Sequence, residues 1–276
     1  MGTTNQAGNN RSNHSILPLL RTQQFYWYLG HVLTLVFFVL NFFSRSLRVY
    51  RLCLLAILLS YFIVIRQIFF KGQAKKTLKS ISDPGFRYQL LKDENVQYLI
   101  LALVFFASSF IVGQVTGGLY SFAIFSLFHS LSYFQTNIVS GLPIGASRKN
   151  SISSAITRFT TGYNKQALFI AANSETIMLS GVFISIPLSA FRIFRNPLYV
   201  LVNVFLFATI VVFLKLRYDS NQYTQAVFNQ WDTKINQLLM HPSAPPSLKY
   251  TYSTTFKGLL KRYIEPIKIQ KNIKKT

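Results

Sequence analysis

The sequence predicts an all-α membrane protein with several bilayer crossings. Half of its 276 residues are hydrophobic, and they gather in long runs. About 20 apolar residues match the hydrocarbon core of a bilayer, because a helix rises about 1.5 Å per residue. The candidate segments are 25–43, 52–70, 96–115, 119–134, 167–191 and 198–214. We predict a polytopic fold of about six hydrophobic segments in three hairpins, followed by a cytosolic C-terminal amphipathic helix.

The basic residues fall mainly on alternate connections between these segments. If both termini share one side of the membrane, that side holds 24 of the 29 Lys and Arg. The other five are Arg45, Arg48, Arg51, Arg192 and Arg195. Lys/Arg excess marks cytoplasmic loops, so we expect both termini and the two long connections in the cytosol. The net charge of +22 follows this topology, and we expect it to face anionic lipids of the cytosolic leaflet rather than nucleic acid.

The first part of the chain combines a polar start with two apolar segments. Residues 1–20 are rich in Asn, Ser, Thr and Gly, and we expect a disordered cytosolic N-terminus there. The helical membrane domain then covers 21–216. In its second segment, Arg66 interrupts the run after about 14 apolar residues. Two interpretations stay open: Arg66 snorkels toward the headgroups, or this hairpin enters the bilayer without fully spanning it.

The middle of the membrane domain carries two signals for element ends. Asp93 and Glu94 precede the third segment and suit the positive end of a helix dipole. Gly117 and Gly118 favour a tight turn between the third and fourth segments, because glycine reaches the conformations that a reversal needs. A polar, Ser/Thr-rich link, 135–166, leads to the fifth segment.

Glu175 is the only acidic residue inside any of the apolar runs. An intramembrane carboxylate can serve a proton relay or transport, and His129 on the fourth segment is a candidate partner. Asn173 stands close to Glu175 in sequence, however, so a polar contact between helices is the simpler explanation. The sequence contains no Walker loop, GxSxG, HExxH or Cys/His metal spacing, and Cys53 is its single cysteine. We therefore predict no enzyme and no cofactor.

Two further units follow the membrane domain. Residues 217–248 are predicted to form a cytosolic packing helix and a Pro-rich turn, with apolar residues at helical spacing. Residues 249–276 form a basic amphipathic tail. Its predicted membrane-binding residues are Phe256, Lys257, Leu259, Leu260, Lys261, Arg262, Tyr263, Ile264, Ile267 and Lys268. Large apolar side chains opposite Lys and Arg are typical of a helix in the interface of an anionic membrane. The alternative is a helix docked on the protein's own cytosolic face.

Several stretches, in order and spacing, carry a family resemblance. They are 90–93 with 98–100, 125–129 with Tyr133, 169–175, 216–220, and Phe228-Asn229 with His241-Pro242. With these the chain resembles the family of the 33-kDa nuclear-pore membrane protein of yeasts and its animal relative, transmembrane protein 33, over roughly residues 20 to 265.

The resemblance implies an integral protein of the endoplasmic reticulum membrane and nuclear envelope without catalytic residues. It implies a role in nuclear pore assembly or distribution and in shaping reticulum alongside reticulon-type proteins. We therefore expect a protein that shapes or stabilises curved membrane. One alternative is an adaptor that recruits nucleoporins or importin-type receptors through the basic tail. Another is a small-solute transporter using Glu175 and His129.

Overall fold

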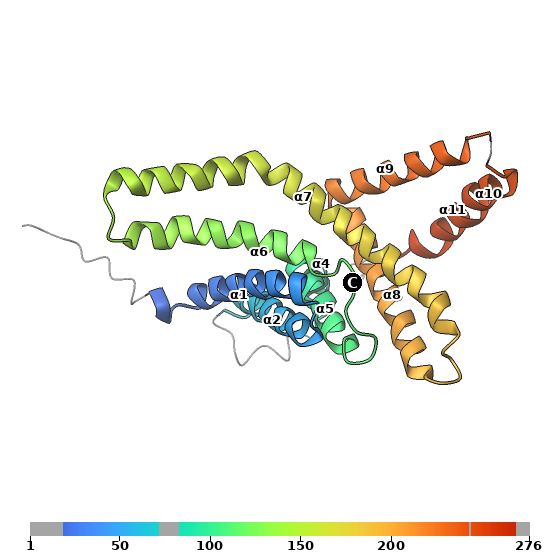
Figure 1. The fold of residues 1–276 in the computed structure, drawn as a ribbon, viewed down its shortest axis with the longest axis horizontal. Coiled ribbons are helices and arrows are strands. Elements are labelled where there is room, and N and C mark those ends of the chain that lie inside the picture. The colour runs from blue at the N-terminus through green and yellow to red at the C-terminus, as the bar shows by residue number, and fades with distance from the viewer. Residues whose placement is uncertain (1–18, 72–82, 243, 269–276) are drawn as a thin grey trace, which may run out of the picture.

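The structure is a computed structural model that describes residues 19–71, 83–242 and 244–268, and within these ranges the regular structure is helical. The main helices are α1 (Gln23–Ser44), α2 (Leu47–Phe69), α4 (Pro84–Lys92), α5 (Glu94–Ser108), α6 (Tyr120–Tyr133), α7 (Ala146–Ala190), α8 (Pro197–Ser220), α9 (Gln222–Leu239), α10 (Pro246–Tyr250) and α11 (Lys257–Leu259) (Figure 1). Four of them, α1, α2, α7 and α8, are long and apolar enough to cross a membrane. The predicted all-α, multi-pass membrane fold is confirmed. The predicted disordered N-terminus lies almost wholly outside the described residues.

The first two helices form a hairpin with a close approach near the start of α1. A Cβ atom added to Gly30 would lie 2.3 Å from Ser60 Oγ and 3.3 Å from Ala56 O, so a larger residue here would displace the Ser60 side chain of α2. The turn at the other end uses Arg45, which adopts the left-handed conformation with a φ of 48° and donates its N–H to Asn41 O. Helix α2 continues past Arg66, so its 23 residues extend about 34 Å. That length favours a full span with Arg66 snorkelling.

The expected second hairpin, between the third and fourth segments, takes a different form. Helix α5 packs mainly on α2 and α8, and α6 mainly on α1 and α7, while the two meet through the Tyr98 ring, which contacts Phe122 and Phe125. The turn between them packs against α5 itself and against α7. A Cβ atom on Gly118 would lie 2.8 Å from the Phe105 ring, and one on Gly117 would lie 3.5 Å from Ser174 O of α7. The Phe38 and Tyr120 rings, 5.4 Å apart, then hold the start of α6 against α1.

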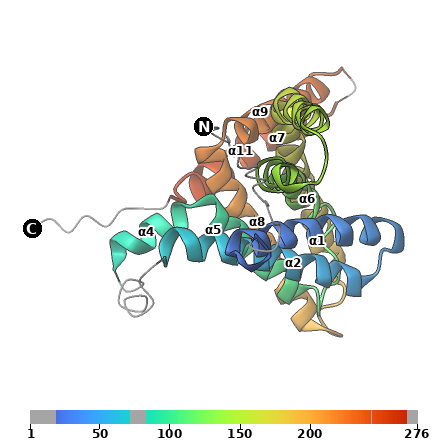
Figure 2. The same ribbon diagram turned by 90° about the vertical axis from the view of Figure 1, so that its left-hand side faces the viewer.

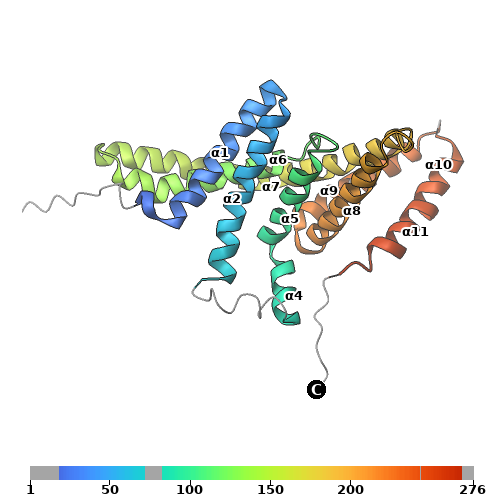
Figure 3. The ribbon, with the colours of Figure 1, turned by 90° about the horizontal axis from the view of Figure 1, so that it is seen from below.

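Helix α7 is longer than the apolar segment that predicted it. Its 45 residues include part of the polar link 135–166, which the sequence analysis left without a helix. This part is helical because it packs on the end of α6. The Phe128 and Phe159 rings lie 5.9 Å apart, and Gln135 Nε2 donates to Thr157 Oγ1 at 2.8 Å. Figures 2 and 3 show α6 and the first half of α7 side by side, at a steep angle to α1 and α2.

The buried core lies where α2, α5, α7 and α8 meet. It includes Tyr50, Phe105, Met178, Leu206 and Ile210. Helix α9 packs on α7 through its first half, where Val227 is fully buried. Its second half, together with α10 and α11, extends away from this core (Figure 1). Of the predicted unit 217–248, residues 217–220 belong to α8, and α9 packs on α7 and α8.

Candidate functional site: a buried charge cluster and an exposed amphipathic helix

Glu175 belongs to a group of side chains from three helices, which we call the core cluster: the buried Tyr98, Glu175 and Arg217, and the more exposed Glu94. Tyr98 donates its hydroxyl to Glu175 Oε1 at 2.5 Å. Arg217 Nη1 lies 2.7 Å from Glu94 Oε2, and its Nε lies 3.9 Å from Glu175 Oε2. The Arg217 guanidinium also stands over the Tyr98 ring, 5.3 Å from its centre. Glu175 and Arg217 are only 2% and 3% exposed. The cluster therefore joins α5, α7 and α8 through charge-assisted contacts.

The core cluster lies at the end of α5 and of α8, and within α7. Glu94 is the first residue of α5, and Asp93 caps that end by accepting from the N–H groups of Asn95 and Val96. Arg217 stands twenty residues after Pro197, the first residue of α8, which corresponds to about 30 Å. Transporter sites typically lie near the bilayer midplane on interrupted helices. The position of the cluster at the end of a span favours a structural contact.

The structure does not bring the three predicted polar residues together. Asn173 Nδ2 donates to Phe169 O of its own helix at 2.9 Å. The His129 ring instead contacts Trp27 and His31 of α1, at 5.3 and 5.0 Å between ring centres. The partners of Glu175 are therefore Tyr98 and Arg217, which the sequence analysis did not connect with it.

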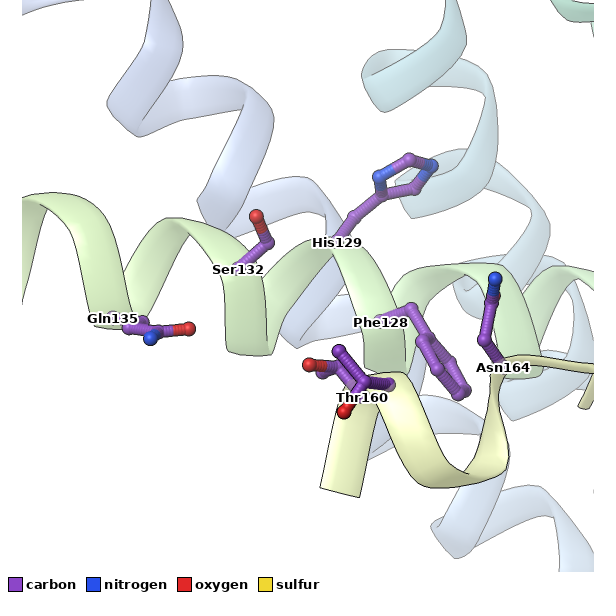
Figure 4. A pocket seen from close by; sticks show the side chains of 7 residues that line it. Phe128, His129, Ser132, Gln135, Thr160 and Asn164 are labelled. Atoms are coloured by element: carbon purple, nitrogen blue, oxygen red, sulfur yellow. The ribbon is translucent and has the colours of Figure 1, made fainter. Parts of the chain in front are cut away.

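His129 also lines a polar pocket between α6 and α7 (Figure 4). The pocket has a volume of about 520 Å³ and is lined by Phe128, His129, Ser132, Gln135, Thr160, Thr161 and Asn164. Figure 4 shows the Phe128 ring reaching toward α7 between Thr160 and Asn164, while His129 points to the other side of α6. No carboxylate, Lys or Arg lines the pocket, so it offers neutral hydrogen-bonding groups. In the described ranges, no three His, Cys, Asp or Glu residues gather as metal ligands.

The tail folds as a helix that begins earlier than its sequence suggests. Its first helical residue is Pro246, three residues before the predicted tail, 249–276. Helical turns continue to Ile264 through α10, α11 and two π-helical segments, Thr251–Phe256 and Leu260–Ile264. We call this unit, 246–264, the tail helix. A π-helix bonds each residue to the fifth one along, so it widens the turn relative to the 3.6-residue period.

A second group of side chains, the tail cluster, holds the tail helix to α9: Asp232, Asn236, Tyr252 and Lys257. Asp232 Oδ1 accepts from the Tyr252 hydroxyl at 2.7 Å and lies 2.8 Å from Lys257 Nζ. The hydrogen bond from Lys257, followed by that from Tyr252, lowers the pKa of Asp232. Burial and the hydrogen bond to Asp232 raise the pKa of Tyr252 to about 12. One Lys of the predicted membrane-binding set is thus paired within the protein.

The rest of the predicted membrane-binding set is largely open to the surroundings. Its exposed apolar side chains are Phe256, Leu259, Leu260 and Tyr263. Ile264 and Ile267 are half-buried, and Lys261, Arg262 and Lys268 are exposed. The tail helix therefore combines an uncovered apolar surface with free basic residues.

Comparisons with known proteins assign the family. The sequence profile described as transmembrane protein 33/nucleoporin POM33 matches residues 6–263. The pore and endoplasmic reticulum protein of 33 kDa of Saccharomyces cerevisiae is 32% identical over 238 residues, which cover 82% of this chain and 85% of the relative. The pore membrane protein of 33 kDa of the same yeast is 28% identical, over 89% of this chain and 85% of its own.

A third relative is more distant. Tetra-spanning protein 1 of Schizosaccharomyces pombe is 24% identical over 90% of this chain and 86% of its own length. No solved structure matches the chain. The names of these relatives describe pore, reticulum or membrane-spanning proteins, and none describes an enzyme. Because the profile covers nearly the whole sequence, the chain belongs to the transmembrane protein 33/nucleoporin POM33 family.

Proposed function

We propose that this protein is a non-enzymatic component of the endoplasmic reticulum membrane and nuclear envelope. It stabilises curved membrane there and supports the assembly or distribution of nuclear pore complexes. Two relatives carry "pore" in their names, and one of these also carries "endoplasmic reticulum". Its immediate partners are anionic lipids of the cytosolic leaflet. Nucleoporins and reticulon-type proteins are the proteins we expect near it.

The tail helix carries this proposal. Phe256, Leu259 and Leu260 are exposed on a helix that stands away from the core, and basic residues alternate with them. Such a helix lies in the plane of an interface with its apolar side chains buried among the acyl chains. Each nearby Lys or Arg adds about 1 kcal/mol of attraction to an anionic surface. The hairpins anchor the protein, and the tail helix inserts beside them as a wedge.

The proposed topology places both termini in the cytosol. The hairpin turns on the opposite side are short, so most of the mass outside the bilayer is cytosolic. Insertion of the tail helix then expands the cytosolic leaflet more than the lumenal one, which favours convex cytosolic curvature. The sequons at Asn10 and Asn13 report on this topology. We expect both to stay unmodified, and glycosidase-sensitive modification of either would contradict the assignment.

Vesicle binding tests the role of the tail. A peptide covering residues 246–268 should be largely unfolded in water and helical on anionic vesicles, more so on small and highly curved ones. Replacing Leu259, Leu260 and Ile264 with Asp should abolish co-flotation. The matched change of Lys257, Lys261 and Arg262 to Gln should weaken binding mainly at low salt. In cells, the full-length Asp variant should stay in the reticulum and lose its enrichment at pores.

A second candidate function is an adaptor. Lys261 and Arg262 are exposed in the tail helix and form no ion pair with the described residues, so they are available to importin-type receptors or other acidic proteins. If the Asp variant binds vesicles as well as the wild type, the lipid proposal is wrong and the adaptor role is favoured. A transporter gains no support from the arrangement of Glu175, because its partners lie at the end of a span and His129 contacts α1.

A further inference from the structure

The turns opposite the tail expose large aromatic side chains. At the α1–α2 turn, Phe43 is 80% exposed, and Phe42 beside it is exposed as well. At the α7–α8 turn, Phe191 and Phe194 are 87% and 98% exposed. Contiguous apolar side chains at such exposure mark a surface that is covered by another apolar phase.

The basic residues at these turns are all arginines. Arg45 and Arg48 flank the first turn, and Arg192 and Arg195 alternate with the phenylalanines of the second. All four are exposed, and in the described parts of the chain none of them forms an ion pair. Arg192 stacks on Tyr199, with its guanidinium 5.1 Å from the ring centre. Arg51 is used internally: it donates to Ser109 and stacks on Phe110.

We infer that both turns end inside the headgroup layer of the leaflet opposite the tail, where the four arginines bind phospholipid phosphates. The planar guanidinium matches a phosphate with two parallel hydrogen bonds. The neighbouring phenylalanines lie at the edge of the hydrocarbon, so nothing of these hairpins projects beyond the membrane. This inference depends on the hairpins as bilayer spans and is independent of the proposed role of the tail.

Two observations indicate that phospholipid, rather than another protein, covers the surface of these turns. First, the apolar surface of the α7–α8 turn continues along both helices through Ile184, Leu188, Leu198 and Leu201, which are exposed and face the bilayer when the hairpin spans it. Second, neither turn contains an Asp or Glu, so a second copy of this chain would bring arginines together without a balancing charge. Phospholipid phosphate supplies that charge beside an apolar phase.

The depth of a spin label tests the position of the turn. We would place a nitroxide on the full-length protein with Phe194→Cys in a Cys53→Ala background, in phosphatidylcholine proteoliposomes. The label should be more accessible to oxygen than to a water-soluble nickel complex. A matched label at Lys234→Cys on α9 should show the opposite preference. Equal nickel accessibility at the two sites would overturn the inference.

The arginines are tested in the same system. Replacing Arg192 and Arg195 with Gln should move the Phe194→Cys label deeper, because the phosphate contacts that hold it are lost. Replacing the same two arginines with Lys keeps the charge and should leave the label near the phosphates. If the label stayed at the same depth when both arginines were replaced with Gln, phosphate binding would not be what holds the turn in place. Strong dipolar broadening between labels on two copies would instead identify the turn as a self-association surface and contradict the lipid assignment.

Discussion

The core cluster and the tail cluster are built from the same chemistry at opposite degrees of burial. In each, a carboxylate accepts a tyrosine hydroxyl and lies near a cation: Glu175 with Tyr98 and Arg217, and Asp232 with Tyr252 and Lys257. The Glu175 side chain is 1% exposed and the Asp232 side chain 43%. The first joins three helices of the membrane domain, whereas the second holds one helix outside it.

Burial decides what each cluster can do. Breaking a buried ion pair leaves an uncompensated charge in a low-dielectric site, which costs several kcal/mol. An exposed pair contributes about 0–1 kcal/mol, because water replaces either partner. The core cluster therefore fixes the arrangement of α5, α7 and α8. The tail cluster can open at little cost, which leaves the tail helix free to exchange α9 for a membrane.

The largest difference is expected when the cation is removed. Arg217→Ala leaves both Glu94 and Glu175 without their cation and should lower the free energy of unfolding by about 3 kcal/mol. Lys257→Ala, the matched change in the tail cluster, should lower it by less than about 1 kcal/mol. Unfolding of the purified protein in mixed micelles measures both. Equal effects would mean that the two clusters do not differ in the way burial suggests.

The tyrosines give the next test. Tyr98→Phe leaves Glu175 without its short hydrogen bond and should cost about 1–3 kcal/mol, as for a buried acceptor that loses its donor. Tyr252→Phe removes a hydrogen bond that water can replace and should stay within about 0.5 kcal/mol of the wild type. Both variants retain the aromatic ring, so the packing of the ring is unchanged and only the hydrogen bond is removed. A cost for Tyr252→Phe that matched that of Tyr98→Phe would remove the distinction.

A smaller effect is expected when Glu175 itself is replaced with Gln. Glu175→Gln keeps an acceptor for Tyr98, and Arg217 retains Glu94, so abundance and localisation should be nearly unchanged. Glu175→Leu should cost more, about 1–3 kcal/mol, because the buried Tyr98 hydroxyl loses its acceptor. Abundance and melting temperature check both variants. If the Gln variant lost function at normal abundance, Glu175 would have a titrating role, and the structural interpretation would be wrong.

The sequence predicted the helical membrane fold and singled out Glu175, because apolar runs and a lone carboxylate within them are visible along the chain. It did not identify Arg217, since the two residues lie on different helices and spacing says nothing about contacts across helices. One signal was available. Glu94 and Arg217 flank different apolar segments on the same predicted side, so a pairing of opposite charges there could have been anticipated.

Two features of the fold also depended on tertiary contacts. The packing of α5 and α6 on different helices accompanies a turn packed between Phe105 and α7, which a Gly-Gly pair alone does not reveal. The start of the tail helix at Pro246 reflects π-helical turns and the contact with Asp232, whereas the sequence pattern assumed regular α-helical periodicity. Local sequence patterns therefore predicted which helices form. Tertiary packing determines where the tail helix begins and which helices α5 and α6 pack against.

The smallest effect is the pH dependence of the tail cluster, for which the direction follows from the two pKa shifts. The pKa of Asp232 is lowered from 3.8. The stability that this carboxylate adds to the tail cluster is therefore present above that value and is lost as the pH falls through the folded pKa. The pKa of Tyr252 is raised from 10.0 to about 12. The stability that its hydroxyl adds to the tail cluster is therefore present below pH 10 and is lost as the pH rises through about 12. The cluster should hold across the neutral range.

Spin labels at Leu238→Cys and Leu259→Cys, in a Cys53→Ala background, measure the separation of α9 and the tail helix. The distance distribution should be unchanged from pH 5 to pH 9 and should broaden only in acid, as the pH falls through the lowered pKa of Asp232. Asp232→Asn should broaden it at every pH, by an amount that corresponds to less than about 1 kcal/mol. An Asn variant with a distribution as narrow as that of the wild type at pH 7 would show that apolar packing holds the tail helix to α9. The release of the tail helix to a membrane would then require the loss of those apolar contacts, and anionic lipid competing for Lys257 alone would not achieve it.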